Sequence, residues 1–316
     1  MLKPKKLLIS HSVIFAIITF IFSMIVSPYY TGGDQEYYIY FYEAIKDLGF
    51  IEGYLIYYGS LGAQEPFYYL LIFMFSRVVD KFLLMSLINA IMGYFLSYNL
   101  IKLKVNKLII YSLLLNYYFV VLMFSAERLK ISLTLLLMVL TTKSIFKSLT
   151  LMLFVVLSHI QSILLLFVIK FGLMKKKSRF LFGKNKIRRS IIYIFITGVI
   201  VSASYFMKDY VLLKFEVYNV NSEIENLIKP IIFLLLSLFF AKQKKLKVFL
   251  SFMPILFFSY LIGDERINIF SFFLFFYFAS RVKKGINFIM IVTLCYYLYK
   301  GFDFTNNILL YQSGYN

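Results

Sequence analysis

Cysteine, histidine and tryptophan are scarce in this 316-residue chain, which contains one, two and none of them respectively. The single cysteine, Cys295, excludes an internal disulfide, and we do not expect a metal–thiolate site. Two histidines and no distinctive spacing of carboxylates leave no metal site to predict, and no cofactor is expected. The chain also lacks a P-loop, a dinucleotide-binding glycine fingerprint and a serine-nucleophile elbow.

Charged residues are also few, because only 16% of the chain is charged whereas 61% is hydrophobic, with a mean hydropathy of +0.80. Soluble domains are about half apolar and about one quarter charged. Long apolar runs separated by short charged segments predict an all-α, polytopic helical integral membrane protein with about ten or eleven membrane helices or half-helices. We expect one transmembrane domain over residues 1–316 and no soluble domain.

Acidic residues are outnumbered by basic ones, 15 to 34, which gives a formal net charge of +19. The bases lie immediately beside apolar runs, which favours the positive-inside rule and contact with anionic membrane lipid over binding to nucleic acid. The basic loop 170–189 is therefore predicted to be cytoplasmic, and the segments 28–65 and 207–229 to be outside. The first apolar run is interpreted as a retained helix rather than a signal peptide, because it is long and no small-residue cleavage site follows it.

The apolar runs predict the following helices: 7–27, 67–76, 82–101, 108–125, 129–142, 148–170, 190–206, 230–241, 248–262, 267–280 and 286–299. A short interfacial helix is expected at 34–47. The middle of the chain allows two topologies. If every run crosses the membrane, Arg128 is cytoplasmic; if 67–76 and 148–170 are re-entrant, Arg128 lies outside, on the same side as Asp34 and residues 264–266.

The segment 28–65, called here the tyrosine-rich segment, contains nine tyrosines, six of the 15 carboxylates and a single base, Lys46. Tyrosine offers a flat apolar face with a hydroxyl group, and carboxylates accept hydrogen bonds from sugar hydroxyls. The segment is therefore a candidate sugar-binding surface on one side of a membrane.

Five ionisable residues each have a structural and a functional interpretation. His159, near the middle of 148–170, is either hydrogen-bonded between helices or a base in a polar cavity. Arg128 and Arg266 are either helix-end arginines that contact a neighbouring acid or lipid, or anchors for a phosphate group. Asp34 and Glu65 are either acids at helix starts or catalytic carboxylates.

The order of these features resembles that of the EpsG/Wzy-type polysaccharide polymerases of bacterial inner membranes. The resemblance covers about residues 30 to 280 and rests on Gly32-Gly33-Asp34 with Tyr37, Tyr38 and Tyr42, on Glu65-Pro66-Phe67-Tyr68-Tyr69, on Arg128 at a helix start, on His159 with Gln161 and Ser162, and on Asp264-Glu265-Arg266. The chain departs from the pattern at Ser132, where a small apolar residue is expected, and at the neighbouring Lys130.

The resemblance implies a glycosyltransferase that polymerises oligosaccharide repeat units linked to undecaprenyl pyrophosphate, at the outer face of the inner membrane. The candidate catalytic residues are Asp34, Glu65 and His159, among which the sequence does not choose. The candidate substrate-binding residues are Arg128, Arg266, Tyr37, Tyr38 and Asp264. The implied partners are the lipid-linked oligosaccharide and, as a candidate, a regulator of chain length.

Two other functions remain open. A transporter or flippase for a lipid-linked glycan would show inverted repeats and interrupted helices; no repeat is apparent, and only Pro230 and Pro254 fall in or at the start of late helices. A membrane acyltransferase would place an acid beside its catalytic histidine, and neither His11 nor His159 has one adjacent in the sequence.

Overall fold

The computed structural model describes residues 4–142, 144–164, Gly198, 224–241, 245–262 and 265–314, and all regular secondary structure in these ranges is helical. The prediction of an all-α protein is confirmed for this part of the chain. The chain forms two compact units, which are described separately. The first comprises Met1–Thr141, Leu157–His159 and Phe288–Asn316, and the second comprises Thr142–Val156 and Ile160–Asn287.

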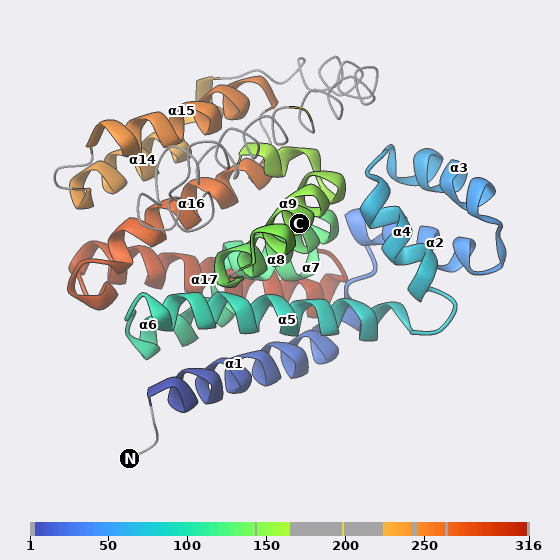
Figure 1. The fold of residues 1–316 in the computed structure, drawn as a ribbon, viewed down its shortest axis with the longest axis horizontal. Helices are drawn as coiled ribbons and strands as arrows, with labels where there is room; N and C mark the ends of the chain where they lie inside the picture. The colour runs from blue at the N-terminus through green and yellow to red at the C-terminus, as the bar shows by residue number, and fades with distance from the viewer. Residues whose placement is uncertain are drawn as a thin grey trace. The chain divides into compact units, whose positions relative to one another are not determined.

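The first unit is built on two long helices that pack along each other, α1 and α5 (Figure 1). Its elements are α1 (Pro4–Val26), η1 (Ser27–Tyr29), α2 (Asp34–Ala44), η2 (Ile45–Asp47), α3 (Phe50–Leu61), α4 (Pro66–Phe75), α5 (Lys81–Lys102), α6 (Lys107–Tyr111), η3 (Ser112–Leu115), α7 (Tyr117–Phe124), α8 (Glu127–Thr141) and α17 (Phe288–Tyr311). Helix α8 packs on α5, and α17 packs on α7 and η3.

The second unit contains a group of three helices, in which α14 packs against α15 and α16. Its described elements are α9 (Ile145–Ser158, whose last two residues belong to the first unit), η4 (Ile160–Ser162), η6 (Ile224–Leu227), α14 (Ile228–Phe240), α15 (Lys245–Ile262), α16 (Glu265–Ser280) and η8 (Lys283–Gly285). The predicted basic loop 170–189, the predicted helix 190–206 apart from Gly198, and residues 207–223 of the predicted outer loop lie outside the described residues.

Three helical segments in the described residues are long and apolar enough to cross a membrane: Leu8–Tyr29, Lys81–Lys102 and Lys283–Tyr311. A fourth span is possible if Lys107–Leu115 and Tyr117–Phe124, which meet at a bend of 53°, form one broken crossing or a re-entrant loop. These helices are typical of a membrane protein. The larger number of spans expected from hydropathy stays a prediction.

Helix starts follow local capping chemistry. The Asp80 carboxylate accepts hydrogen bonds from the backbone N–H groups of Phe82 and Leu83, at 2.8 and 3.1 Å, and so caps α5. Pro66 occupies the first position of α4, where its missing N–H leaves no bond unmade. Helix α3 ends at Gly62, whose φ of +52° is the left-handed conformation that glycine adopts without strain.

Two predicted helices are interrupted in the structure. The predicted helix 108–125 is interrupted at Asn116, whose side chain accepts a hydrogen bond of 3.2 Å from the backbone N–H of Tyr118 and thereby starts α7 as a new helix. The predicted helix 148–170 centres on His159, but α9 ends at Ser158 and His159 lies between α9 and η4. Hydropathy averages over an apolar run and therefore does not show that a single polar residue within the run ends a helix.

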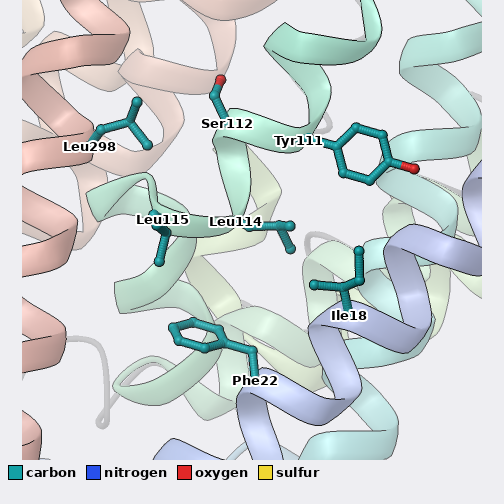
Figure 2. Close-up of a pocket in the computed structure, with 7 residues that line it drawn as sticks. All are labelled: Ile18, Phe22, Tyr111, Ser112, Leu114, Leu115 and Leu298. Atoms are coloured by element: carbon teal, nitrogen blue, oxygen red, sulfur yellow. The ribbon is translucent and has the colours of Figure 1, made fainter.

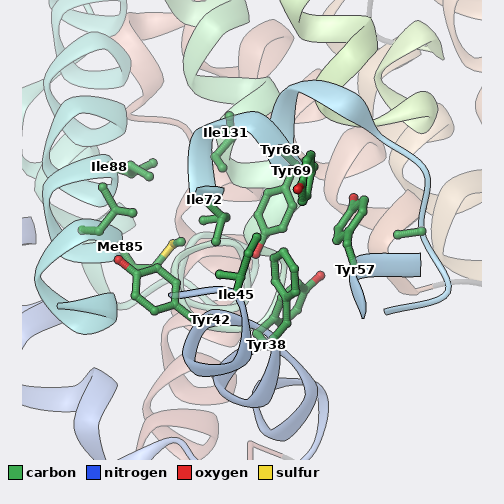
Figure 3. Packing of buried hydrophobic residues seen from close by; sticks show 13 residues of the cluster. Tyr38, Tyr42, Ile45, Tyr57, Tyr68, Tyr69, Ile72, Met85, Ile88 and Ile131 are labelled. Atoms are coloured by element: carbon green, nitrogen blue, oxygen red, sulfur yellow. The ribbon is translucent and has the colours of Figure 1, made fainter. Parts of the chain in front are cut away.

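The tyrosine-rich segment is folded rather than an open loop, because α2, η2 and α3 fill most of it. Seven of its nine tyrosines fall into two groups. Tyr38, Tyr42 and Tyr57 are buried in a core with Tyr68 and Tyr69 of α4 (Figure 3). The exposed group consists of Tyr29, Tyr37, Tyr40 and Tyr58. Only this second group is available as an open aromatic surface, whereas the first group holds α2, α3 and α4 together.

A glycine allows α17 to approach the interruption between η3 and α7. A Cβ atom on Gly301 would lie 2.0 Å from the carbonyl oxygen of Leu115, a backbone atom that cannot move aside easily. We therefore expect Gly301→Ala to destabilise the protein by about 3 kcal/mol or more, at or above the usual cost of overpacking a core. A midpoint of thermal unfolding followed by circular dichroism in detergent checks this.

The matched control for this prediction is Gly59→Ala. Gly59 lies within α3, and a Cβ there would meet nothing within 4 Å. Alanine should therefore raise stability by up to about 1 kcal/mol through its higher helix propensity. Equal unfolding midpoints for the two variants would mean that the close approach at Gly301 does not exist.

Candidate functional site

The carboxylate of Glu65 is the centre of a buried polar cluster in the first unit. Glu65 precedes Pro66 and is 1% exposed. Its side chain does not cap α4. Instead, Oε2 accepts hydrogen bonds from Nη1 of Arg128 at 2.8 Å and from the Tyr57 hydroxyl at 3.2 Å, and Oε1 lies 3.2 Å from Nδ1 of His159. Arg128 and His159, both far from Glu65 in the sequence, therefore meet Tyr57 at one carboxylate.

Arg128 stands at the start of α8 and contributes the positive charge of this cluster. Its guanidinium group bridges two partners, because Nε also donates to the Tyr38 hydroxyl at 3.2 Å. The Arg128 residue is 8% exposed. Burial raises the pKa of the Glu65 carboxyl, but the charge of Arg128 and the hydrogen bond from His159 outweigh it and bring that pKa below its ordinary value. Glu65 is thus an anion at neutral pH.

His159 is oriented by Glu65. The residue is 6% exposed, and its Nδ1 atom faces the carboxylate. When Nδ1 carries the proton, its N–H donates a hydrogen bond to Glu65. Nε2 is then the basic nitrogen of a neutral imidazole. A carboxylate that fixes a histidine tautomer in this way is the arrangement of a general base with its orienting group. The cluster therefore combines a group able to move a proton with a guanidinium able to hold an anion.

A second buried cluster centres on Glu127, the residue before Arg128. The Glu127 carboxylate pairs with Nζ of Lys81 at 3.1 Å and accepts a hydrogen bond of 2.9 Å from the Tyr68 hydroxyl. Burial raises the pKa of Glu127, but the nearby lysines lower it to a net value below the ordinary one. Lys81 also donates to Oε1 of Gln35 at 2.6 Å.

Lys130 is the most unusual member of the second cluster. It is 1% exposed, and its ammonium group donates to the Met123 carbonyl at 2.8 Å without pairing directly with a carboxylate in the described part of the chain. It lines a cavity of about 10 Å³ together with Gln35, Lys81 and Glu127. A cavity of this size holds one water molecule at most. Across the two clusters, Arg128 and two lysines face two carboxylates, so these five side chains carry an excess of positive charge.

The residues predicted from the sequence are distributed unevenly. Glu65, Arg128, His159 and Tyr38 meet in the first cluster. Asp34 is half-buried in the first turn of α2, one turn before Tyr38, and Tyr37 is exposed to 57%. Asp264 and the side chain of Arg266 lie outside the described residues. Within the described ranges no three His, Cys, Asp or Glu side chains lie close enough to hold a metal ion.

Sequence reasoning missed the central residues of the second cluster. Lys81 and Glu127 flank apolar runs, where a charge ordinarily marks a solvated helix end. Lys130 was noted only as a departure from a family pattern. Its position in the sequence could have identified it, because a lysine inside a run of apolar residues must be paired with other polar groups or serve a function.

The two buried lysines give a matched test of this arrangement. Lys81→Met should destabilise the protein by about 3–5 kcal/mol, because it leaves the buried Glu127 carboxylate without its ion pair. Lys130→Met should be neutral or stabilising, because it removes a buried charge that has a carbonyl group as its acceptor. Unfolding midpoints of both variants in the same detergent check the difference, and equal losses would contradict it.

No family model, curated protein or solved structure matches this chain. The class that the structure defines is an all-helical protein, within the described residues, with at least three helices able to cross a membrane.

Proposed function

We propose that this chain is a polytopic glycosyltransferase of the bacterial cytoplasmic membrane. It polymerises oligosaccharide repeat units linked to undecaprenyl pyrophosphate into O-antigen, capsule or exopolysaccharide, and the Glu65 cluster is its active site. The observation that carries the proposal is the contact of Glu65 with both Arg128 and His159, which are 63 and 94 residues away. All three residues were nominated by their order along the chain, and they converge in one buried cluster.

In the proposed reaction, a hydroxyl oxygen of the acceptor sugar attacks the anomeric carbon of the donor. The new C–O bond forms as the bond between that carbon and the pyrophosphate oxygen breaks, and the bonding electron pair leaves with the pyrophosphate. The hydroxyl proton passes to Nε2 of His159, while Glu65 holds Nδ1–H and stabilises the imidazolium. Glu65 is thus a positioning residue and His159 the catalytic base.

Arg128 is the proposed anchor for the departing pyrophosphate. A guanidinium group presents planar paired donors that match phosphate oxygens. Its present partners are Glu65 and Tyr38, so a bound pyrophosphate would replace at least one of these hydrogen bonds. The excess positive charge of the two clusters favours this exchange, because it leaves the site able to accept a further anion. This function places Arg128 on the outer side of the membrane.

Deletion of the gene followed by analysis of surface-glycan chain length is the direct test. We expect single repeat units in place of the polymer, restored by the wild-type gene. His159→Asn should not restore the polymer, while Tyr299→Phe, a change at an exposed residue of α17, should restore most of it. Membrane levels of each variant are measured by immunoblot. A full polymer with His159→Asn would remove the histidine from the mechanism.

A transporter or flippase for a lipid-linked glycan is the second candidate. The broken helix pair around Asn116, with its bend of 53°, favours it, since transporters often build their sites at interrupted helices. The same deletion strain separates the two functions. Loss of a polymerase leaves lipid-linked units at the outer face, accessible to an impermeant glycosidase, whereas loss of a flippase leaves them protected inside.

A further inference from the structure

An apolar pocket of about 290 Å³ opens between two helices able to cross a membrane, α1 and α17, and the first half of the bent helix pair (Figure 2). It is lined by Ile18 and Phe22 of α1, by Tyr111, Ser112, Leu114 and Leu115 of α6 and η3, and by Leu298 of α17. Its volume is just below the range of about 300–1,000 Å³ that is typical of ligand sites. Inside a bilayer, a pocket with such a lining is filled by hydrocarbon rather than by water.

One residue of the pocket connects it to a basic group of side chains. The Tyr111 hydroxyl lies 3.5 Å from Nδ1 of His11, and Nζ of Lys107 contacts Nε2 of the same ring. Lys107 and Tyr111 are one helical turn apart on α6, which is about 5.4 Å along the axis. The pocket therefore has a polar, cationic rim at one end.

The two stretches of chain that meet at this rim, the start of α1 and the end of α5 with α6, contain several basic residues and no acidic ones. Helix α1 runs antiparallel to α5, because Ser23 contacts Ser86 and Thr19 lies against Gly93. The end of α5 thus lies beside the first turns of α1. The bases of these two stretches are Lys5, Lys6, Lys102, Lys104 and Lys107, and residues 4–12 and 99–112 contain no carboxylate. An exposed lysine that contacts a histidine, with no acid on either stretch, favours an anionic ligand.

We propose that the pocket and its rim bind one anionic phospholipid of the surrounding bilayer. The phosphate lies at Lys107 and His11, and one acyl chain enters the pocket beside Leu114. The site depends on insertion of these helices in a membrane, but not on the glycosyltransferase function. Its phosphate position is also separate from the Glu65 cluster. Lys81, which pairs with Glu127 beside that cluster, begins α5, whereas the phosphate position lies near the other end of α5. A helix of 22 residues spans about 33 Å.

The test uses purified protein in a neutral detergent, titrated with phosphatidylglycerol or with phosphatidylcholine of the same chains. Unfolding is followed by circular dichroism. We expect phosphatidylglycerol to raise the unfolding midpoint and phosphatidylcholine to leave it nearly unchanged. Lys107→Gln should weaken the apparent affinity for phosphatidylglycerol about fivefold, which corresponds to about 1 kcal/mol for one lysine near a membrane surface. Leu114→Trp, which fills the pocket, should abolish the effect.

Lys46→Gln is the matched control, because Lys46 is a half-buried lysine of η2 that lies away from the pocket in the sequence and pairs with Glu43. It should leave the lipid response unchanged. Lys107 is itself exposed, so Lys107→Gln tests the site even if Leu114→Trp fails to fold. A polyprenyl phosphate is titrated in the same way. Three results would overturn the proposal: equal stabilisation by the two phospholipids, an unaltered response to phosphatidylglycerol in Lys107→Gln, or stabilisation by the polyprenyl phosphate but not by phosphatidylglycerol.

Discussion

Replacing Glu65 by leucine should destabilise the protein by about 3–5 kcal/mol, because it leaves the buried Arg128 charge without its counterion. The same change removes the acceptor of the Tyr57 hydroxyl and the partner of His159. Leucine is no smaller than glutamate, so the loss reflects charge and hydrogen bonding rather than a cavity. Thermal and denaturant unfolding in detergent measures it.

Glu36→Leu is the control for this experiment. Glu36 is an exposed carboxylate in the first turn of α2, and its removal should change stability by no more than about 0.5 kcal/mol, as is usual for surface positions. Glu65→Gln is a milder second variant, because the amide keeps an oxygen acceptor for Arg128. If Glu65→Leu unfolds at the wild-type midpoint, the buried ion pair does not exist and the proposed site loses its centre.

The pH dependence of stability gives an independent readout of the same carboxylate. The folded-state pKa of Glu65 is below the ordinary value of 4.5, so its ionised form is stabilised by folding. This stability is fully present above the ordinary pKa and is lost as the pH falls below it. The advantage of wild type over Glu65→Gln should therefore be constant from pH 8 to about pH 6 and shrink below about pH 4.5.

The sequence predicts helices best where one local signal decides their ends. Asp80 before α5 and Pro66 in α4 are such signals, and the predicted helices 82–101 and 67–76 agree with the observed ones within one residue at each end. The last apolar run was predicted too short, because α17 continues to Tyr311 through polar positions that hydropathy counts against a helix. Asn116 broke a predicted helix because its side chain competes for a backbone N–H group.

The site is harder to predict, because its contacts join residues that no local pattern connects. Glu65 is satisfied by partners from two other segments, and hydropathy scores a charge identically whether it is solvated or paired. The resemblance nominated Arg128 and His159 through their order, but not through contact. The tyrosine-rich segment shows the same limit, since its composition cannot separate Tyr38, which is buried against Arg128, from the neighbouring exposed Tyr37.

Replacing Arg128 by alanine should reduce polymerisation about 30- to 1,000-fold, which corresponds to about 2–4 kcal/mol of lost stabilisation of the leaving group. Arg128→Lys should also be impaired. Arginine donates from Nε to Tyr38 and from Nη1 to Glu65, and a single ammonium group cannot reproduce this planar pair of bonds or a two-pronged contact with pyrophosphate. Arg281→Lys, at an exposed arginine beside Tyr277, is the matched control and should retain wild-type activity.

The readout must separate chemistry from folding, because the alanine change also strands the buried Glu65 carboxylate. Polymer length is therefore measured at equal membrane levels, and the unfolding midpoint of each purified variant is recorded beside it. If the guanidinium group holds pyrophosphate, Arg128→Lys must lose more polymerisation activity than its reduced amount of folded protein explains. Tyr38→Phe removes one acceptor of Arg128 and keeps the charge, so its polymer length should lie between those of wild type and Arg128→Lys. A full-length polymer from Arg128→Ala, or labelling that places residue 128 on the cytoplasmic side, would exclude this arginine from the reaction.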